Sequence, residues 1–290
     1  MSGKVLIYGR GGGIGSFVAS SLAQNGDGLH FTGRDEHNLK AVSEMSKSST
    51  EATSIVDLGS FPKAGVAMIF GAGGGIGGAL VEALSSSDSF GHVIGFSRKT
   101  SPSIDLMDEA SLEHAATFAA EMGELRLVID ATGFLHDDRQ RPEKSWRQLD
   151  AGNLARSFAL NAIGPALIMK HVLPLLPRSG KAVFATLSAR VGSIGDNRLG
   201  GWYSYRASKA ALNQPVRTAA VELARRSPEG ICIALHPGTV ATALSAPFAA
   251  TELDVHTPAE ASRQLLAVVD KLTVEANGGF FDWRGQPVPW

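Results

Sequence analysis

A tyrosine and a lysine four residues apart are the pair in this chain best suited to acid–base chemistry. Tyr205 and Lys209 lie in the segment Trp-Tyr-Ser-Tyr-Arg-Ala-Ser-Lys, residues 202–209. On a helix this spacing places both side chains on one face, within reach of each other. An ammonium beside a phenol favours the phenolate, so we expect the pKa of Tyr205 to fall from about 10 toward neutrality. Such a tyrosine can exchange a proton with a carbonyl or alcohol oxygen.

A glycine-rich loop upstream has the surroundings of a dinucleotide-phosphate site. The apolar run 66–70 is followed by Gly71–Gly77, then by a helix-like stretch and a second apolar run, 92–96. Glycines let the backbone approach a pyrophosphate, and the helix that follows presents free N–H groups to it. The alternative is a tight strand–helix turn that binds no ligand.

Several segments, taken in order, resemble the short-chain dehydrogenase/reductase family over residues 64–290. The matching positions are the spaced glycines Gly71, Gly75 and Gly77, Asn161 in Asn-Ala-Ile-Gly-Pro, Ser188 after the predicted strand 181–187, Tyr205 with Lys209, and the segment 237–242. The stretches Gly-Gly-Trp-Tyr-Ser-Tyr and Ser-Ala-Arg-Val-Gly-Ser are most similar to the C-factor-type branch, near small carbonyl reductases. The resemblance implies an α/β fold with a doubly wound, Rossmann-like parallel sheet. It also implies an NAD(P)(H)-dependent oxidoreductase that interconverts a carbonyl and an alcohol by hydride transfer.

The resemblance assigns roles to the matching residues. Ser188 would hold the substrate oxygen, and Tyr205 would act as the general acid or base. Lys209 would lower the pKa of the tyrosine and bond the nicotinamide ribose, while Asn161 would hold a water that links Lys209 to solvent. The cofactor-binding positions that it implies are Gly71, Gly74, Gly75, Ile76, Gly77, Arg98, Asp105, Ala131, Gly133, Lys209, Pro237, Gly238, Val240 and Thr242.

Two features depart from the family pattern. The segment 130–133 reads Asp-Ala-Thr-Gly where the family often has Asn-Asn-Ala-Gly, which alters an adenine-side contact. The gap between Ser188 and Tyr205 is also longer than the family commonly shows, and Ser193 within it is a rival for the serine role. We favour Ser188 because it follows a predicted strand, at the edge where open α/β sheets bind ligands.

The residues after the second predicted strand bear on the choice of cofactor. An NAD site usually has an acidic residue there to accept from the ribose 2′-OH, whereas an arginine suits a 2′-phosphate. This chain has Arg98 and Lys99. These residues favour NADP over NAD, and the alternative is that both are simply solvated. Asp105 is expected near the adenine ring, by resemblance to the family.

The chain begins with a second copy of its own motif. The strand-like run 5–8 precedes the glycine loop 9–15, and residues 1–60 have the pattern β-α-β-α-β, which is half of a nucleotide-binding unit. Residues 61–65 then form a linker to a catalytic domain over 66–290. The extra half-unit could be a duplicated scaffold without a ligand or a site for a second nucleotide. The second loop fits the catalytic tyrosine better. A path through five strand–helix units takes on the order of 130 residues, which is close to the separation of the second loop from Tyr205 and much shorter than that of the first loop.

Composition narrows the classes of function. The 27 Lys+Arg against 28 Asp+Glu give a net charge of −1, and no basic stripe indicates nucleic acid. No apolar run reaches about 18 residues and no signal-peptide pattern is present, so we expect a cytoplasmic protein without a membrane span. We expect a small-molecule carbonyl or alcohol substrate and no metal site. The sequence allows a homo-oligomer but does not decide the oligomeric state.

Two other functions stay open. One is a non-catalytic nucleotide-binding sensor or signalling protein of C-factor type. The other is a sugar-nucleotide epimerase or dehydratase, which shares the Tyr and Lys but normally needs a larger C-terminal domain. Apolar residues that could line a substrate pocket are Phe134, Leu135, Trp202, Tyr203, Leu244 and Phe248.

Overall fold

The computed structural model describes residues 56–248 and 255–290 of the 290-residue chain. The chain divides into two units, Met1–Thr53 and Ser54–Trp290, and the fold below is that of the second unit. The half-unit predicted for residues 1–60, with its glycine loop 9–15, therefore lies almost entirely outside the described residues.

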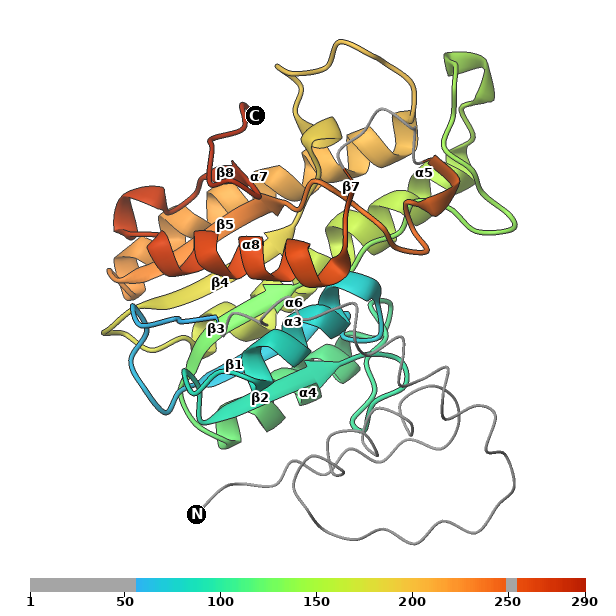
Figure 1. The fold of residues 1–290 in the computed structure, drawn as a ribbon. Helices are drawn as coiled ribbons and strands as arrows, with labels where there is room; N and C mark the ends of the chain where they lie inside the picture. Colours follow the sequence, from blue (N-terminus) through green and yellow to red (C-terminus); the bar gives the residue numbers. More distant parts are fainter. Residues whose placement is uncertain (1–55, 249–254) are drawn as a thin grey trace, which may run out of the picture. The chain divides into compact units, whose positions relative to one another are not determined.

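A six-stranded parallel sheet forms the centre of the second unit (Figure 1). In spatial order its strands are β2 (His92–Phe96), β1 (Val66–Phe70), β3 (Leu125–Asp130), β4 (Ala182–Leu187), β5 (Gly230–His236) and β8 (Phe280–Asp282). All neighbouring strands pair in parallel. The chain runs outward from β1 to β2 and then returns to β3 on the other side of β1, so the strand order reverses between β1 and β3. This is the predicted doubly wound sheet, and ligands of such sheets bind at the carboxyl ends of the strands near the reversal.

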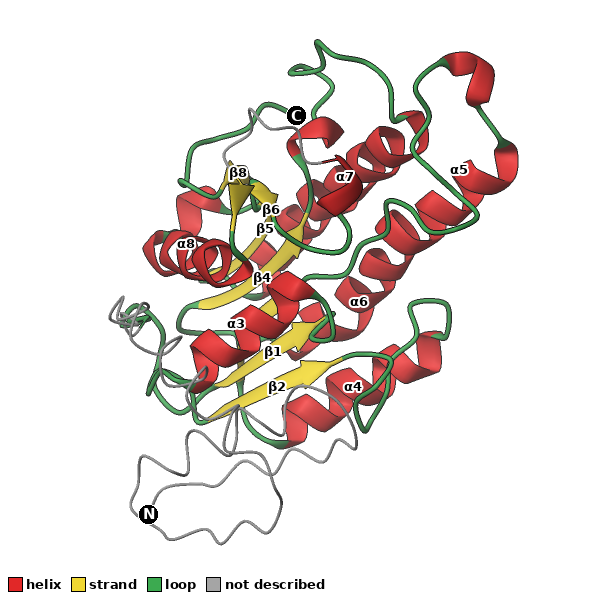
Figure 2. Cartoon of the chain, turned by 45° about the vertical axis from the view of Figure 1, so that its right-hand side comes forward, coloured by secondary structure: helices red, strands yellow, loops and turns green. Residues whose placement is uncertain are grey.

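Helices cover both faces of the sheet, which is why the strands are apolar at nearly every position. Successive side chains of a strand point to opposite faces, so Met68 joins one core cluster and Ile69 the other. The first face is covered by α4 (Glu109–Glu121), α6 (Gly164–Val172) and α7 (Tyr203–Arg226), and the second by α3 (Gly75–Ser85) and α8 (Pro258–Lys271) (Figures 1 and 2).

Local sequence explains where two helices begin. Thr257 and Glu260 form a capping box at α8, with Pro258 in its first turn. Asp108 caps α4 by accepting from the backbone N–H of Ala110. In contrast, the N-cap residue of α3 is Gly74, which has no side chain to bond the first N–H groups.

The packed domain starts before residue 66. Leu58 and Phe61 are both buried in the cluster that includes Ile69. Ser60 accepts a hydrogen bond from Lys181 Nζ at 2.8 Å, and its backbone N–H donates to Asp270 at 3.1 Å. Residues that the sequence places at the end of the half-unit and in the linker 61–65 therefore belong to this domain.

The stretch Ala151–Leu175 is long and apolar enough to cross a membrane, with a mean hydropathy of 1.4, although polar residues interrupt its apolar runs. It comprises α5 (Ala151–Phe158), a π-helical turn (Ala159–Ile163), α6 and a last short turn. Its residues Ile168 and Val172 are fully buried in the core against the sheet. The α6 part of the stretch therefore packs against the core of this domain.

Candidate active site

Loops from neighbouring strands meet at the carboxyl edge of the sheet. A Cβ atom added at Gly71, directly after β1, would lie 2.8 Å from the backbone of Ala131, directly after β3. A Cβ atom at Gly75 would lie 2.8 Å from the side chain of Thr242. Lys209 reaches the end of β4, where its Nζ donates to the carbonyl oxygen of Leu187 at 2.7 Å. The structure thus brings the glycine loop and the Tyr/Lys helix to the same edge.

The packing of the glycine loop leaves no space for side chains at some of its glycines. Gly71 has a φ of +81°, a conformation that other residues rarely adopt. A Cβ atom at Gly77 would lie only 2.2 Å from the carbonyl oxygen of Gly71. With Gly74 as an N-cap that has no side-chain bond, the first turn of α3 presents its N–H groups, including those of Gly75 and Ile76, without a capping side chain. This is the cradle that an anionic pyrophosphate fits.

Tyr205 and Lys209 lie in the first two turns of α7, on one face as predicted. The Lys209 side chain is 2 % exposed, and its Nζ lies 6.0 Å from the centre of the Tyr205 ring. The pair is therefore close, although the ammonium bonds a backbone oxygen of β4 rather than the phenol.

The expected fall in the tyrosine pKa is wrong for the chain by itself. Burial raises the pKa of Tyr205 to about 12. Burial also lowers the pKa of Lys209 to about 8, while the charge of Asp130 opposes that fall. The expectation failed because the helical spacing shows that the two groups are near but does not show that the domain half-buries the tyrosine and buries the lysine. Burial disfavours an anionic phenolate in this setting.

Asn161 joins two parts of the site from the π-helical turn. Its side chain is fully buried, and its amide exchanges hydrogen bonds with the backbone of Phe134, at 2.7 and 2.8 Å. The amide nitrogen also donates to Ser208 Oγ at 3.1 Å. A Cβ atom added at Gly133 would lie 3.8 Å from Lys209 Nζ and 3.9 Å from Asn161 Oδ1. Asn161 therefore lies near Lys209, but its amide bonds protein atoms on both sides.

The hydroxyl of Ser188 bonds a residue of α7. It donates to Asn213 Oδ1 at 2.7 Å, and the residue is 4 % exposed. Asn213 comes eight positions after Tyr205, about 12 Å along the helix axis at 1.5 Å per residue. A role at the substrate oxygen would require this hydroxyl to leave Asn213. The sequence could not show this, because the strand end fixes the position of Ser188 but not its partner.

The rival serine is bonded elsewhere. Ser193 Oγ accepts from the backbone N–H of Asp196 at 3.1 Å and donates to the carbonyl oxygen of Trp290 at 3.5 Å. Its hydroxyl therefore holds its own loop and the end of the chain.

The remaining predicted cofactor positions lie around the glycine loop. A Cβ atom at Gly73 would lie 3.2 Å from Ser97, and the next residue, Arg98, is exposed. Asp105 is also exposed, but its carboxylate accepts from the backbone N–H of Met107 at 2.9 Å.

The segment after β5 turns at Gly238. Pro237 and Gly238 follow the strand, and Gly238 has a φ of +79° with Trp283 packed against it. Val240 ends β6 (Thr239–Val240), which pairs with β7 (Val255–His256). The turn carries the chain on to Thr242, beside Gly75.

Asp130 is a buried polar residue that the sequence marks only as a departure from the family. Its carboxylate is fully buried at the end of β3 and accepts from both the N–H and the hydroxyl of Thr132, at 3.0 and 2.6 Å, and from Thr186 at 2.7 Å. Burial raises the pKa of this carboxyl, while those hydrogen bonds and the charge of Lys209 oppose the rise. An aspartate that directly follows the apolar run Leu127, Val128 and Ile129 of a strand is the signal that could have identified it.

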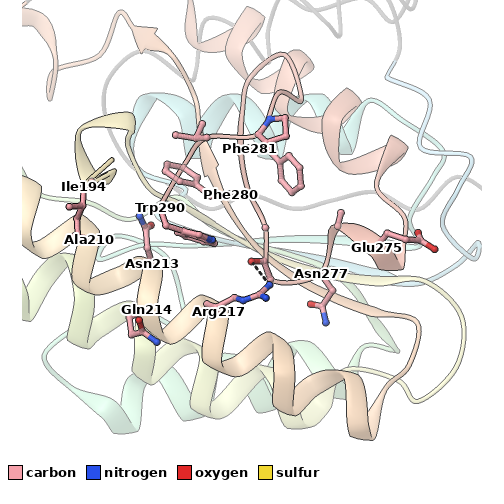
Figure 3. A pocket seen from close by; sticks show the side chains of 16 residues that line it. Ile194, Ala210, Asn213, Gln214, Arg217, Glu275, Asn277, Phe280, Phe281 and Trp290 are labelled. Atoms are coloured by element: carbon pink, nitrogen blue, oxygen red, sulfur yellow. Dashed lines mark hydrogen bonds between the residues drawn. The ribbon is translucent and has the colours of Figure 1, made fainter. Parts of the chain in front are cut away.

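A cavity of about 590 Å³ lies beside α7, and none of the predicted catalytic or cofactor-binding residues lines it (Figure 3). Its lining includes Asn213 and Trp290, the partners of Ser188 and Ser193. Its walls include Arg217, which donates to the carbonyl oxygen of Gly278 at 3.2 Å, and the aromatic rings of Phe280 and Trp290. The cavity is therefore not a continuation of the candidate active site.

Comparisons with known proteins agree with this geometry. Residues 71–269 match the family model described as enoyl-(acyl carrier protein) reductase. Among curated proteins, the chain is 40% identical over 144 residues to C-signal of Myxococcus xanthus, covering 49% of this chain and 81% of that protein. It is 34% identical over 191 residues to 1-hydroxy-2-glutathionyl-2-methyl-3-butene dehydrogenase of Rhodococcus sp. (strain AD45), covering 65% and 79%.

Among solved structures, the NADPH-bound carbonyl reductase from chicken fatty liver superposes with a TM-score of 0.69 at 25% identity, covering 80% of this chain and 97% of that one. The matched region includes the glycine loop, Asn161, Ser188 and the Tyr205–Lys209 pair. The described fold and these matches agree over the same part of the chain. The chain belongs to the short-chain dehydrogenase/reductase family, a family of NAD(P)-dependent oxidoreductases.

Proposed function

We propose that this chain is an NADPH-dependent reductase that converts a small carbonyl compound to an alcohol, with Tyr205 as the proton donor. One observation carries the proposal. Tyr205 and Lys209 share a face of α7, and Lys209 reaches the same sheet edge at which the glycine loop contacts Ala131. A proton donor and a dinucleotide cradle at one edge are what such a reduction needs.

The residues of the glycine loop fit a dinucleotide. The crowding at Gly71 and Gly77 keeps backbone rather than side chains at the surface of the loop, and α3 offers N–H groups without a capping side chain. When bound, a reduced nicotinamide supplies hydride to the carbonyl carbon. The chain's part is to bind that cofactor, to hold the carbonyl beside Tyr205 and to deliver the proton.

NADPH is favoured over NADH by the residues that follow β2. Arg98 and Lys99 are exposed there, with no ion pair to either in the described ranges 56–248 and 255–290. Free basic side chains suit a 2′-phosphate. The carbonyl reductase from chicken fatty liver was solved with NADPH, which supports the same choice.

In the proposed reduction, Tyr205 donates its proton to the oxygen of the substrate carbonyl. With a pKa of about 12 in the chain alone, the phenol holds its proton at neutral pH, which is the state that a donor to a developing alkoxide needs. Oxidation of an alcohol would instead need the phenolate. Ser188 belongs to this proposal as a second donor to the carbonyl, which it becomes only when its hydroxyl turns away from Asn213.

A signalling role is the second candidate, and the similarity to C-signal favours it. Such a protein could bind the nucleotide without turning over a carbonyl. The two candidates differ in turnover, and both allow cofactor binding.

Turnover of NADPH with a panel of small aldehydes, ketones and quinones tests the proposal. We expect oxidation of NADPH with at least one compound. The Tyr205→Phe variant keeps the ring but loses the proton, so its turnover should fall by roughly 10²-fold or more, while NADPH binding is retained. No turnover across the panel would favour the signalling role, and full turnover by the Phe variant would remove Tyr205 from the mechanism.

A further inference from the structure

The first turn of α7 is held by an acidic side chain from a distant loop. The N-cap residue, Trp202, makes no side-chain capping bond. Instead, Glu143 accepts from the backbone N–H of Ser204 at 3.0 Å and from the Ser204 hydroxyl through its other carboxylate oxygen. The carbonyl oxygen of Glu143 also accepts from the backbone N–H of Trp202. Glu143 and Ser204 are 61 positions apart in sequence, and they are 2 % and 1 % exposed.

These bonds hold a turn that a chain does not adopt easily. Gly200, Gly201 and Trp202 have φ values of +64°, +66° and +53° in succession. Trp202 is the strained member, because a side chain with a Cβ is disfavoured in the left-handed region. Such a conformation persists only where the surroundings hold it, and strain of this kind gathers at functional sites. Arg206 adds a further tie, from its Nε to the carbonyl oxygen of Gly201 at 2.9 Å.

The held turn leads directly to the candidate proton donor. Ser204 immediately precedes Tyr205. The N–H that donates to Glu143 is therefore only one residue before the tyrosine. The ring of Trp202 also meets the Tyr205 ring edge-on, with centres 6.2 Å apart, and meets Phe248 at 5.2 Å. Both the backbone and one neighbour of the tyrosine ring therefore depend on Glu143.

The charge of Glu143 is matched by the helix rather than by a cation. No ion pair to Glu143 occurs within residues 56–248 and 255–290. Its carboxylate lies at the N-terminus of a 24-residue helix, where the helix dipole favours negative charge. The ordinary helix caps of this domain differ, because Asp108 and Thr257 directly precede the helices that they cap. A cap brought from a separate loop links the position of α7 to that loop.

From these contacts we propose that Glu143 is a positioning residue, which sets the place and direction of the Tyr205 hydroxyl at the reacting oxygen. This inference rests on the proposed function, because it gives Tyr205 the role of proton donor. Loss of the Glu143 bonds lets the strained turn relax and moves the tyrosine, and a displacement of 1 Å in a reacting group can cost about 10²-fold in rate. Cofactor binding depends on the glycine loop instead and should change little.

The Glu143→Gln variant tests the inference through turnover with a carbonyl substrate that the wild type reduces. We expect kcat to fall about 10- to 100-fold, with KM for NADPH within about twofold of the wild-type value. The same change in the Tyr205→Phe background should cause no further loss, because Glu143 acts through the hydroxyl that this background lacks. A merely structural role would instead lower the rate by the same factor in both backgrounds, and that result would overturn the proposal.

A matched control is the Glu260→Gln variant. Glu260 is also a carboxylate at a helix start, and it accepts from the N–H of Thr257 at 2.7 Å. We expect its kcat to stay within about twofold of wild type; an equal loss in both Gln variants would make the effect general to capping and contradict the proposal. If Glu143→Gln fails to fold, Ser204→Ala removes one donor only, and a full kcat in that variant would likewise contradict it. A wild type and a Tyr205→Phe variant that turn over equally would refute the proposed function itself, which is a separate outcome.

Discussion

The change of Gly77 to alanine tests whether the glycine loop is the cofactor cradle. In the structure the added methyl would lie 2.2 Å from the Gly71 carbonyl oxygen, 2.7 Å from its carbonyl carbon and 3.1 Å from the Ala72 nitrogen. Carbon atoms in ordinary contact are about 3.5–4.0 Å apart, so loop and helix must separate by about 1 Å or more. All of these neighbours are backbone atoms and cannot turn aside as a flexible side chain could.

The expected size of the effect follows from that overlap. Overpacking of this kind costs about 1–3 kcal/mol. The better helix propensity of alanine, about 1 kcal/mol at most, stabilises the free and the cofactor-bound protein alike and does not offset the loss of binding. Because the loop must be restored to bind a pyrophosphate, most of the cost should fall on binding. We therefore expect the Kd for NADPH to rise between about 5- and 150-fold.

The assay is a fluorescence titration of NADPH, with thermal unfolding measured in parallel. The neighbouring Gly78→Ala variant is the control, because its methyl would lie 3.3 Å from the Ala72 carbonyl oxygen, a tight but adjustable contact on the same helix. We expect its Kd to stay within about threefold of wild type. A Gly77→Ala variant that folds and binds NADPH as the wild type does would refute the assignment of this loop.

Three further predictions concern the cofactor, pH and the repeat. Arg98→Asp should weaken NADPH and improve NADH binding, because an acid repels a 2′-phosphate and accepts from a free 2′-OH; equal affinity of the wild type for both cofactors would remove the basis for this. Burial lowers the pKa of Lys209 to about 8 against 10.5 when unfolded, so the unfolded chain binds more protons in that window and stability rises with pH there. In denaturant titrations, the free energy of unfolding of the wild type should therefore rise relative to that of Lys209→Met, by up to about 3 kcal/mol between pH 8 and 10.5. A difference between the two proteins that does not change with pH would contradict a buried lysine with a lowered pKa. Gly75→Asp should abolish turnover while Gly13→Asp should leave it largely intact, with calorimetry giving one NADPH per chain; two tight sites, or loss only in the Gly13 variant, would reverse the assignment of the two loops.

Local patterns were enough to predict the parts of the fold that local forces decide. The strand β1 is a short apolar run between Gly65 and Gly71, and the largely apolar strand β2 follows Gly91. The start of α8 is encoded within four residues by Thr257, Pro258 and Glu260. The packing of Leu58 and Phe61 was not predictable in this way. Their burial depends on surfaces formed by elements far along the chain, so the sequence alone indicates a linker.

The candidate site shows the same division. The spacing of Tyr205 and Lys209 predicts a shared helix face, which the structure has, but the direction of the tyrosine pKa depends on burial by the whole domain. The partner of the Ser188 hydroxyl lies on a helix that begins after a long loop, so no local pattern could name it. Glu143 was missed for a related reason, because its contact with Ser204 spans 61 positions and its own surroundings resemble an ordinary charged loop.

The most direct test of carbonyl reduction at this site is the fate of deuterium placed on both C4 positions of NADPH. With a carbonyl compound that the wild type reduces, we predict an alcohol that carries one deuterium on the former carbonyl carbon. The Tyr205→Phe variant should form the same product roughly 10²-fold more slowly or worse. An alcohol free of deuterium, or deuterated product formed by the Phe variant at the wild-type rate, would contradict hydride transfer with Tyr205 as the proton donor.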